Sequence, residues 1–464
     1  MPEPLRTSTH PSPTTYWAEH AWLDPHVAPG VALDVGADGR ISAVRTDLAA
    51  PPPGAQLLRG LTVPGLANAH SHAFHRALRG TVQVGSGTFW TWREVMYGVA
   101  SRLTPDTYHA LARAAYAEMA LAGITAVGEF HYLHHGPGGT PYADPNAMAE
   151  ALIAAADEAG VRIALLDTAY LHGGLTAAGH HPLEGPQLRF GDGSADAWYE
   201  RWSRLRAVER GAGDRVRIGA ALHSVRAFAE SDGYADFAAR TDGAPVHVHL
   251  SEQPAENEAC LAVHGTTPTG LLARHGFWKP TTTAVHATHL TDDDVRTLGE
   301  AGAGVCMCPT TERDLADGIG RAVDLQRAGT PLSLGSDSHA VIDLLEEARA
   351  MELDERLRTR TRGHFTAAAL LRAATADGHA ALGWPDAGRL APGAPADFTT
   401  VALDTVRTAG PVPRLAAEAV VFAGTAADVR DVIVAGRPVV RDGRHLRLPD
   451  VAAELAAAIA AVRP

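Results

Sequence analysis

Three histidines stand close together in the segment NAHSHAFHRAL, residues 68–78, which follows an apolar run. His70 and His72 form an H-x-H pair, and because alternate residues of a β-strand face the same side, both imidazoles can bind one ion. Zinc accepts such nitrogens together with carboxylate oxygens, and catalytic zinc sites keep a position open for water. His75 lies past the expected strand end, so we expect it to face a substrate or a loop. An H-x-H pair alone also fits two buried, hydrogen-bonded histidines, so further ligands are needed from elsewhere in the chain.

Residues with suitable side chains also stand at the ends of three later apolar runs. HVHLSE contains His249 and Glu252, AVHATH contains His286, and LGSDSH contains Asp337. In a parallel barrel the carboxyl ends of all strands meet at one face, where active sites are built. The sequence therefore predicts one metal-dependent enzyme site at that face. A surface carboxylate at Glu252 and a helix N-cap at Asp337 are the alternatives for these single positions.

These residues need a scaffold of strands, and the chain between residues 61 and about 340 alternates short apolar runs with Ala-rich amphipathic segments. One such segment has Thr104 as a plausible N-cap, Pro105 at the first helical position and Gly123 as a stop. Eight strands with intervening helices predict an α/β fold with a (β/α)8 barrel of the TIM type. A doubly wound open sheet is less favoured, because no Gly-rich phosphate fingerprint follows the first strand. The predicted strands cover residues 61–69, 123–131, 161–169, 216–223, 244–251, 282–289, 303–308 and 330–337.

Two unlike segments flank this region, and both contain β-like runs separated by Gly and Asp turn residues. We expect residues 16–60 and 388–445 to pair into one small composite β-sandwich domain. An Ala-rich helix is expected at 451–462. The predicted domain organisation is residues 1–60 for the first part of the β domain, 61–387 for the barrel, and 388–464 for the second part with the terminal helix.

Composition restricts the partners of the chain. The 464 residues carry a formal net charge of −13, which argues against a nucleic-acid surface because phosphate binding relies on Lys and Arg. No apolar run approaches the ~18 residues that span a bilayer, and the first residues do not read as a secretion signal. Cys260, Cys306 and Cys308 are too few for a disulfide framework, which fits a reducing compartment, and we expect a cytoplasmic protein. The C-x-C pair is better explained by alternation in an apolar strand than by a zinc or redox role.

The ordered segments PGLANAHSHAFHRAL, HVHLSEQ, VHATHLT and GSDSH resemble the amidohydrolase superfamily, in its deaminase branch with a single metal. The fourth strand ends in ALHSVR and lacks the lysine that two-metal members carry, which supports one metal. The resemblance implies that Glu252, His286 and Asp337 handle protons while a metal-activated water attacks the substrate. Zinc is the expected metal, with iron or manganese as alternatives, and a homodimer is the expected assembly. The implied metal ligands are His70, His72, His249 and Asp337.

Three further segments, FWTWREVMY, VGEFHYLHH and LHSVRAF, resemble the subgroup that deaminates N-formimino-L-glutamate in histidine breakdown. This implies a small anionic substrate, whose carboxylates suit guanidinium groups. The subgroup reads HSHAFQR where this chain has HSHAFHR, so His75 leaves the exact substrate open. The alternatives are another formimino or guanidino acid, a nucleobase, S-adenosylhomocysteine or a triazine, and, in a different class, a catalytically inactive barrel that serves as a binding protein. The implied substrate contacts are His75, Arg93, Tyr132, His223 and Arg226, for which an ion pair, a rim aromatic or a core histidine are the plainer explanations.

Overall fold

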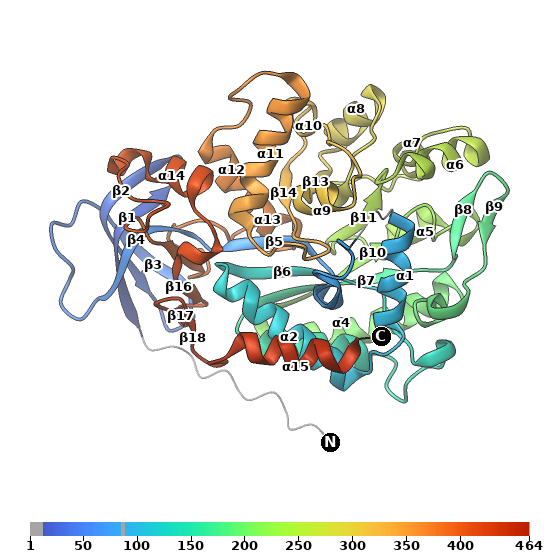
Figure 1. The fold of residues 1–464 in the computed structure, drawn as a ribbon, viewed down its shortest axis with the longest axis horizontal. Helices are drawn as coiled ribbons and strands as arrows, with labels where there is room; N and C mark the ends of the chain where they lie inside the picture. The colour runs from blue at the N-terminus through green and yellow to red at the C-terminus, as the bar shows by residue number, and fades with distance from the viewer. Residues whose placement is uncertain (1–12, 85–88, 464) are drawn as a thin grey trace.

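The computed structural model describes residues 13–84 and 89–463, and its centre is a barrel of eight parallel strands (Figure 1). The strands neighbour one another in chain order, and the ring closes where Ser71 forms a parallel bridge with Asp337. The predicted barrel is therefore confirmed. The barrel strands are β5 (Leu66–Ser71), β6 (Ile124–His131), β7 (Arg162–Ala169), β10 (Val216–Leu222), β11 (Val246–Leu250), β12 (Thr282–His286), β13 (Gly304–Met307) and β14 (Leu332–Leu334).

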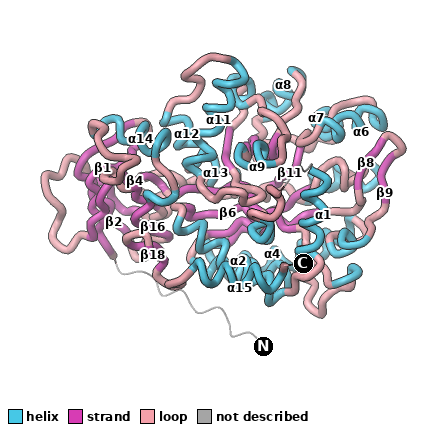
Figure 2. Tube along the Cα trace, viewed as in Figure 1, coloured by secondary structure: helices cyan, strands magenta, loops and turns pink. Residues whose placement is uncertain are grey.

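Helices surround the barrel strands (Figure 2). Several begin at a capping side chain: before α2, for example, the Thr104 hydroxyl accepts a hydrogen bond from the Thr107 amide, and Pro105 occupies the first helical position. Their apolar faces pack on the strands and form the main hydrophobic core. The helices are α1 (Phe89–Ala100), α2 (Pro105–Leu121), α3 (Ala147–Ala159), α4 (Ala195–Ala212), α5 (Tyr234–Arg240), α6 (Pro254–His264), α7 (Pro268–Arg274), α8 (Asp292–Ala301), α9 (Pro309–Asp314), α10 (Ala322–Arg327), α11 (Leu344–Thr359), α12 (Ala367–Ala374) and α13 (Ala376–Ala381).

A second sheet of eight strands lies at one end of the barrel and is built from both flanking segments. The two parts join where β4 pairs antiparallel with β15, and the hydroxyls of Thr62 and Thr400 lie 2.9 Å apart across this junction. Tyr16 and Phe398 pack edge to face in its core. The strands are β1 (Thr14–Leu23), β2 (His26–Val35), β3 (Ile41–Arg45), β4 (Gln56–Pro64), β15 (Phe398–Val401), β16 (Val429–Val434), β17 (Arg437–Arg441) and β18 (Arg444–His445).

Residues 61–69, which the sequence suggests as a single strand, are divided between the two sheets. Residues 61–64 end β4 in the second sheet, and β5 of the barrel begins at Leu66. Gly65 lies between them, in close contact with Thr125, where a Cβ atom would come within 2.1 Å of the threonine hydroxyl. The apolar run of residues 61–69 is continuous in sequence, but the chain passes from one sheet to the other at Gly65, the only glycine of that run.

Three smaller elements complete the fold: the hairpin of β8 (Gly174–Thr176) and β9 (Gly179–His181), helix α14 (Ala416–Ala423), and helix α15 (Val451–Val462), which packs against α2. The three cysteines are buried free thiols, and Cys306 and Cys308 lie with Ala69 and Val285 in an apolar cluster, as expected for a strand. Within residues 13–84 and 89–463, no helix combines the length and apolarity needed to cross a bilayer.

Candidate metal centre and active site

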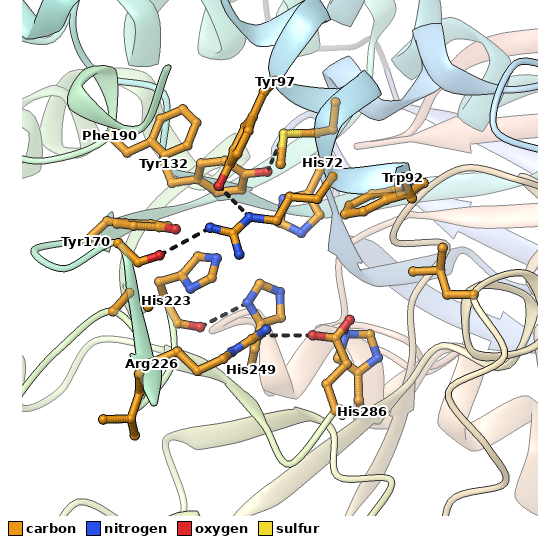
Figure 3. A pocket seen from close by; sticks show the side chains of 18 of the residues that line it. His72, Trp92, Tyr97, Tyr132, Tyr170, Phe190, His223, Arg226, His249 and His286 are labelled. Carbon is orange, nitrogen blue, oxygen red and sulfur yellow. Dashed lines mark hydrogen bonds and ion pairs between the residues drawn. The ribbon is translucent and has the colours of Figure 1, made fainter. Parts of the chain in front are cut away.

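The carboxyl ends of the barrel strands open into a cavity of about 270 Å³. Its walls combine aromatic rings with histidines, two arginines and carboxylates, and the labelled side chains of Figure 3 converge on the same space. The lining includes almost every candidate site residue, while His70 lies buried just beneath it. The candidate residues among the lining are His72, His75, Arg93, Tyr132, His223, Arg226, His249, Glu252, His286 and Asp337.

Four of these side chains bring one donor atom each to a common point at the base of the cavity. The Nε2 atoms of His70 and His249 lie 3.1 Å apart, and the Asp337 Oδ1 atom lies 3.4 Å from the Nε2 atoms of both His70 and His72. All four residues are buried. The donor atoms of His70, His72 and Asp337 all lie within 4.8 Å of one another, and so do those of His70, His249 and His286, so His70 is common to two sets that suit a small cation.

The hydrogen bonds behind the imidazoles show that these nitrogens fit a metal ion. The Nδ1 atom of His72 donates to the Phe130 carbonyl at 2.9 Å, and that of His249 donates to the His223 carbonyl at 2.9 Å. Because a carbonyl can only accept, each Nδ1 carries the proton and each Nε2 turns a lone pair toward the common point.

Burial also keeps these imidazoles neutral. It lowers the pKa of His72 to about 3 and lowers those of His70 and His249 well below the ordinary value. Three neutral imidazoles and one carboxylate therefore face each other, and neutral imidazole nitrogens with a carboxylate are a donor set that suits a divalent metal.

His286 and Glu252 lie beside this donor set. The His286 Nε2 atom is 3.8 Å from both the Glu252 Oε1 and the Asp337 Oδ2 atoms, and its Nδ1 atom is 3.5 Å from the Glu312 Oε1 atom. Burial lowers the pKa of His286, but the carboxylates of Glu252, Glu312 and Asp337 outweigh burial and raise the pKa to about 10. The arrangement can hold and move protons between a carboxylate and an imidazole next to the donor set.

The wall of the cavity also carries groups suited to an anion. The Arg226 Nη2 atom donates to Glu252 at 3.0 Å, and its Nε atom lies 3.5 Å from the carboxylate of Glu256. The Arg93 Nε atom donates to the Tyr97 hydroxyl at 2.5 Å. Burial and the nearby charge of Arg226 lower the pKa of His223 well below its ordinary value, so this imidazole is neutral.

His75 does not join the metal donors. Its Nε2 atom lies 3.0 Å from the Tyr132 hydroxyl, and its ring packs edge-on against Trp92 and Phe74. Burial lowers its pKa well below the ordinary value. The third histidine of the opening motif is thus a neutral wall residue beside Tyr132, on the side of the cavity expected for substrate.

Three acidic residues at the site were missed by the sequence reasoning. Glu312 follows β13 in the segment CPTTERDLADG and accepts a hydrogen bond from the Cys308 amide at 2.9 Å, and Asp317 lies in the same segment. Burial, together with the nearby carboxylate of Glu252, raises the pKa of Asp317 to about 8. Glu256 stands four residues after Glu252. Their position is the usable signal, since both segments directly follow the carboxyl end of a barrel strand.

A second buried cluster of metal-ligand residue types has a different explanation. His131, His134 and Asp167 lie close together outside the cavity. The Asp167 carboxylate, however, already receives two hydrogen bonds from Arg201, at 2.6 and 2.9 Å, and one from Trp198 at 2.9 Å. The guanidinium neutralises this carboxylate, so the cluster is a buried ion-pair network that supports the strand ends.

Comparisons with known proteins agree with this geometry. A model of the amidohydrolase family matches residues 61–439. The chain is 39% identical over 439 residues to the formimidoylglutamate deiminase of Pseudomonas aeruginosa, covering 92% of this chain and 95% of the relative. It is 33% identical over 360 residues to the 8-oxoguanine deaminase of the same organism, covering 76% of each chain. Among solved structures, an amidohydrolase from Brucella melitensis superposes with a TM-score of 0.88 at 32% identity, over 97% of this chain and 99% of that one.

Proposed function

This chain belongs to the amidohydrolase family and is an aminohydrolase, and we propose that it hydrolyses N-formimino-L-glutamate to N-formyl-L-glutamate and ammonia, as a step of histidine degradation. The choice of substrate is supported by two guanidinium groups, those of Arg93 and Arg226, which line the same cavity as the metal donors. A substrate with two carboxylates and a compact amidine matches this wall, because guanidinium groups pair well with carboxylates. The high identity to a formimidoylglutamate deiminase over nearly the whole chain supports the same choice.

We propose that His70, His72, His249 and Asp337 hold one zinc ion, which when bound supplies an activated water and polarises the reacting carbon. In the reaction, water adds its oxygen to the formimino carbon, the carbon–nitrogen bond to the terminal nitrogen breaks, and that nitrogen leaves as ammonia. The Asp337 carboxylate lies where it can take the proton lost by water, and the His286 Nε2 atom lies 3.8 Å from both Asp337 and Glu252, where it can relay a proton between them. Glu252 lies between His286 and Arg226, so it can pass a proton to the departing nitrogen.

The remaining roles belong to the wall residues. We propose that Arg226 and Arg93 bind the substrate carboxylates, and that Tyr132, His223 and His75 supply neutral hydrogen-bonding groups around the formimino nitrogen and the chain of the substrate. We also propose a homodimeric, cytoplasmic protein without nucleic-acid or membrane partners.

The test is ammonia release by the purified chain, loaded with zinc, from N-formimino-L-glutamate, 8-oxoguanine and S-adenosylhomocysteine in parallel. We expect release from the formimino acid alone, loss after chelation, and recovery on adding zinc. Ammonia release from 8-oxoguanine or S-adenosylhomocysteine, without release from the formimino acid, would refute the proposed substrate but would still support hydrolytic deamination as the reaction. Failure with all three, after loading with zinc, iron or manganese, would contradict the proposed chemistry.

A further inference from the structure

Three motifs of the sequence contain a residue that the proposed chemistry does not use. Ser71 stands between His70 and His72, Glu129 lies near the end of β6, and His339 stands two residues after Asp337. Strand alternation turns Ser71 and Glu129 away from the cavity, toward the helices outside the barrel. All three are buried, with relative exposures of 0%.

These three side chains form a continuous chain of hydrogen bonds behind the metal donors. The Glu129 carboxylate accepts from the Ala73 amide at 2.7 Å and from the Ser71 hydroxyl at 2.8 Å, and the Ser71 oxygen lies 3.1 Å from the Nε2 atom of His339. Ser71 has one hydroxyl proton, which it gives to the carboxylate. The Nε2 atom of His339 must therefore donate to Ser71, so the chain runs from His339 through Ser71 to Glu129.

The backbone around Asp337 and His339, which these hydrogen bonds help to fix, is conformationally strained. Asp337 has a φ of +41° and His339 a φ of +57°, in the left-handed region that residues with side chains rarely adopt. Such backbone persists only where its surroundings fix it. Backbone bonds from Asp337 to His70 and from His72 to Asp337 join this segment to β5, and the Arg79 side chain donates to the His339 carbonyl at 2.7 Å.

We propose that Glu129 is a positioning residue that, through Ser71 and His339, sets the spacing between the His70–His72 pair and Asp337 and thereby the affinity of the site for its metal. The inference rests on the proposed metal centre but not on the choice of substrate. Glu129 is the fixed end of the chain, because its two oxygens connect β6, the end of β5 and the turn after it. Partners of this kind behind metal ligands usually change metal affinity by roughly 10- to 100-fold when removed.

The test measures the zinc dissociation constant of the full chain by competition with a chelator, together with the visible spectrum of the cobalt-loaded protein. We expect Ser71→Ala and Glu129→Ala to weaken zinc binding by about 10- to 100-fold and to change the cobalt spectrum. Glu129→Gln should remain within about fivefold of the unchanged chain, because its amide oxygen can accept from Ala73 while its NH₂ group donates to Ser71, which reverses the chain without breaking it.

Glu352→Gln is the matched control. Glu352 is also fully buried. Its carboxylate accepts from the backbone amides of Gly363 at 2.9 Å and Phe365 at 2.8 Å and from the Arg356 Nε atom at 2.7 Å, but it lies on α11 away from the donor set. We expect it to lower the unfolding temperature and leave zinc affinity and the cobalt spectrum unchanged.

Wild-type zinc affinity in Ser71→Ala would overturn the proposal, and so would an equal loss in Glu352→Gln. If Glu129→Ala does not fold, Ser71→Ala decides alone, since it removes a single oxygen atom. These measurements contain no substrate, so a wrong substrate cannot produce either result. Absence of zinc binding by the unchanged chain would instead contradict the proposed metal centre.

Discussion

Replacing Arg226 by Met should reduce activity on the formimino acid selectively. The guanidinium lines the cavity, and its charge is the feature that a carboxylate substrate would use. Hydrogen bonds to charged groups contribute about 1.5–3 kcal/mol each, so losing a carboxylate contact should cost about 3 kcal/mol. At about 1.36 kcal/mol for each factor of ten, kcat/KM for N-formimino-L-glutamate should fall about 150-fold.

The same substitution also leaves Glu252 and Glu256 without their shared cation, so a second effect must be separated from the first. These carboxylates lie 3.0 and 3.5 Å from the guanidinium, and breaking a buried pair of this kind costs about 3–5 kcal/mol of stability. Any disturbance of Glu252 acts on every substrate alike. Loss of a carboxylate contact acts only on the acid.

The assay therefore compares steady-state kcat/KM for N-formimino-L-glutamate with that for an N-alkylformamidine that lacks carboxylates. We expect the ratio of the two values to fall about 150-fold in Arg226→Met. Arg349→Met is the control, because Arg349 also pairs with a glutamate, Glu346, but lies on α11 outside the cavity. An equal loss for both substrates would refute the reasoning, because it would show that Arg226 acts through Glu252 and not on the substrate.

Glu252→Gln should lower kcat by about 10²- to 10⁴-fold while zinc content stays unchanged, and undiminished turnover would exclude a proton-transfer role. His75→Gln should lower KM for the formimino acid about fivefold, because the amide has two N–H donors beside Tyr132 where the neutral imidazole has one. A KM that stays the same or rises in steady-state assays contradicts this. Burial opposes ionisation of Asp192, but hydrogen bonds from His135 and Arg201 outweigh it and hold the pKa below the ordinary value. The Asp192 carboxylate therefore stabilises the fold fully above its unfolded-state pKa of about 4, and this contribution is lost as the pH falls below that value. The difference in unfolding free energy between the unchanged chain and Asp192→Asn should shrink from about pH 5 to about pH 3 in denaturant titrations. A constant difference would show that this pKa is not lowered.

Much of the site was predictable because two simple regularities act together. Alternation along a strand places His70 and His72 on one side, and the barrel brings the carboxyl ends of β5, β11, β12 and β14 to one face. Residues separated by more than 260 positions, such as His70 and Asp337, therefore meet without any local signal between them. For this reason the donor atoms of His70, His72 and Asp337 lie within 4.8 Å of one another in the structure.

What the sequence could not show depends on neighbours that are distant in the chain. Glu129, Glu256 and Glu312 read as ordinary charges, and only the fold shows that burial and specific partners make them part of the site. The position of the break between β4 and β5 likewise depends on Thr125, which packs against Gly65. The assignment of His75 to the wall beside Tyr132 required the loop geometry after β5, which no periodicity describes.

The pairing of β4 with β15 has a consequence for the synthesis of the chain. Strands β1 to β4 leave the ribosome first, but the partner of β4 begins at Phe398, roughly 330 residues later. At about 5–20 residues per second, the open edge of β4 waits roughly 20 to 70 seconds for its partner. An unpaired apolar strand edge can pair wrongly with another chain. During this interval the nascent protein is therefore exposed to pairing with neighbouring nascent chains, which chaperones can prevent.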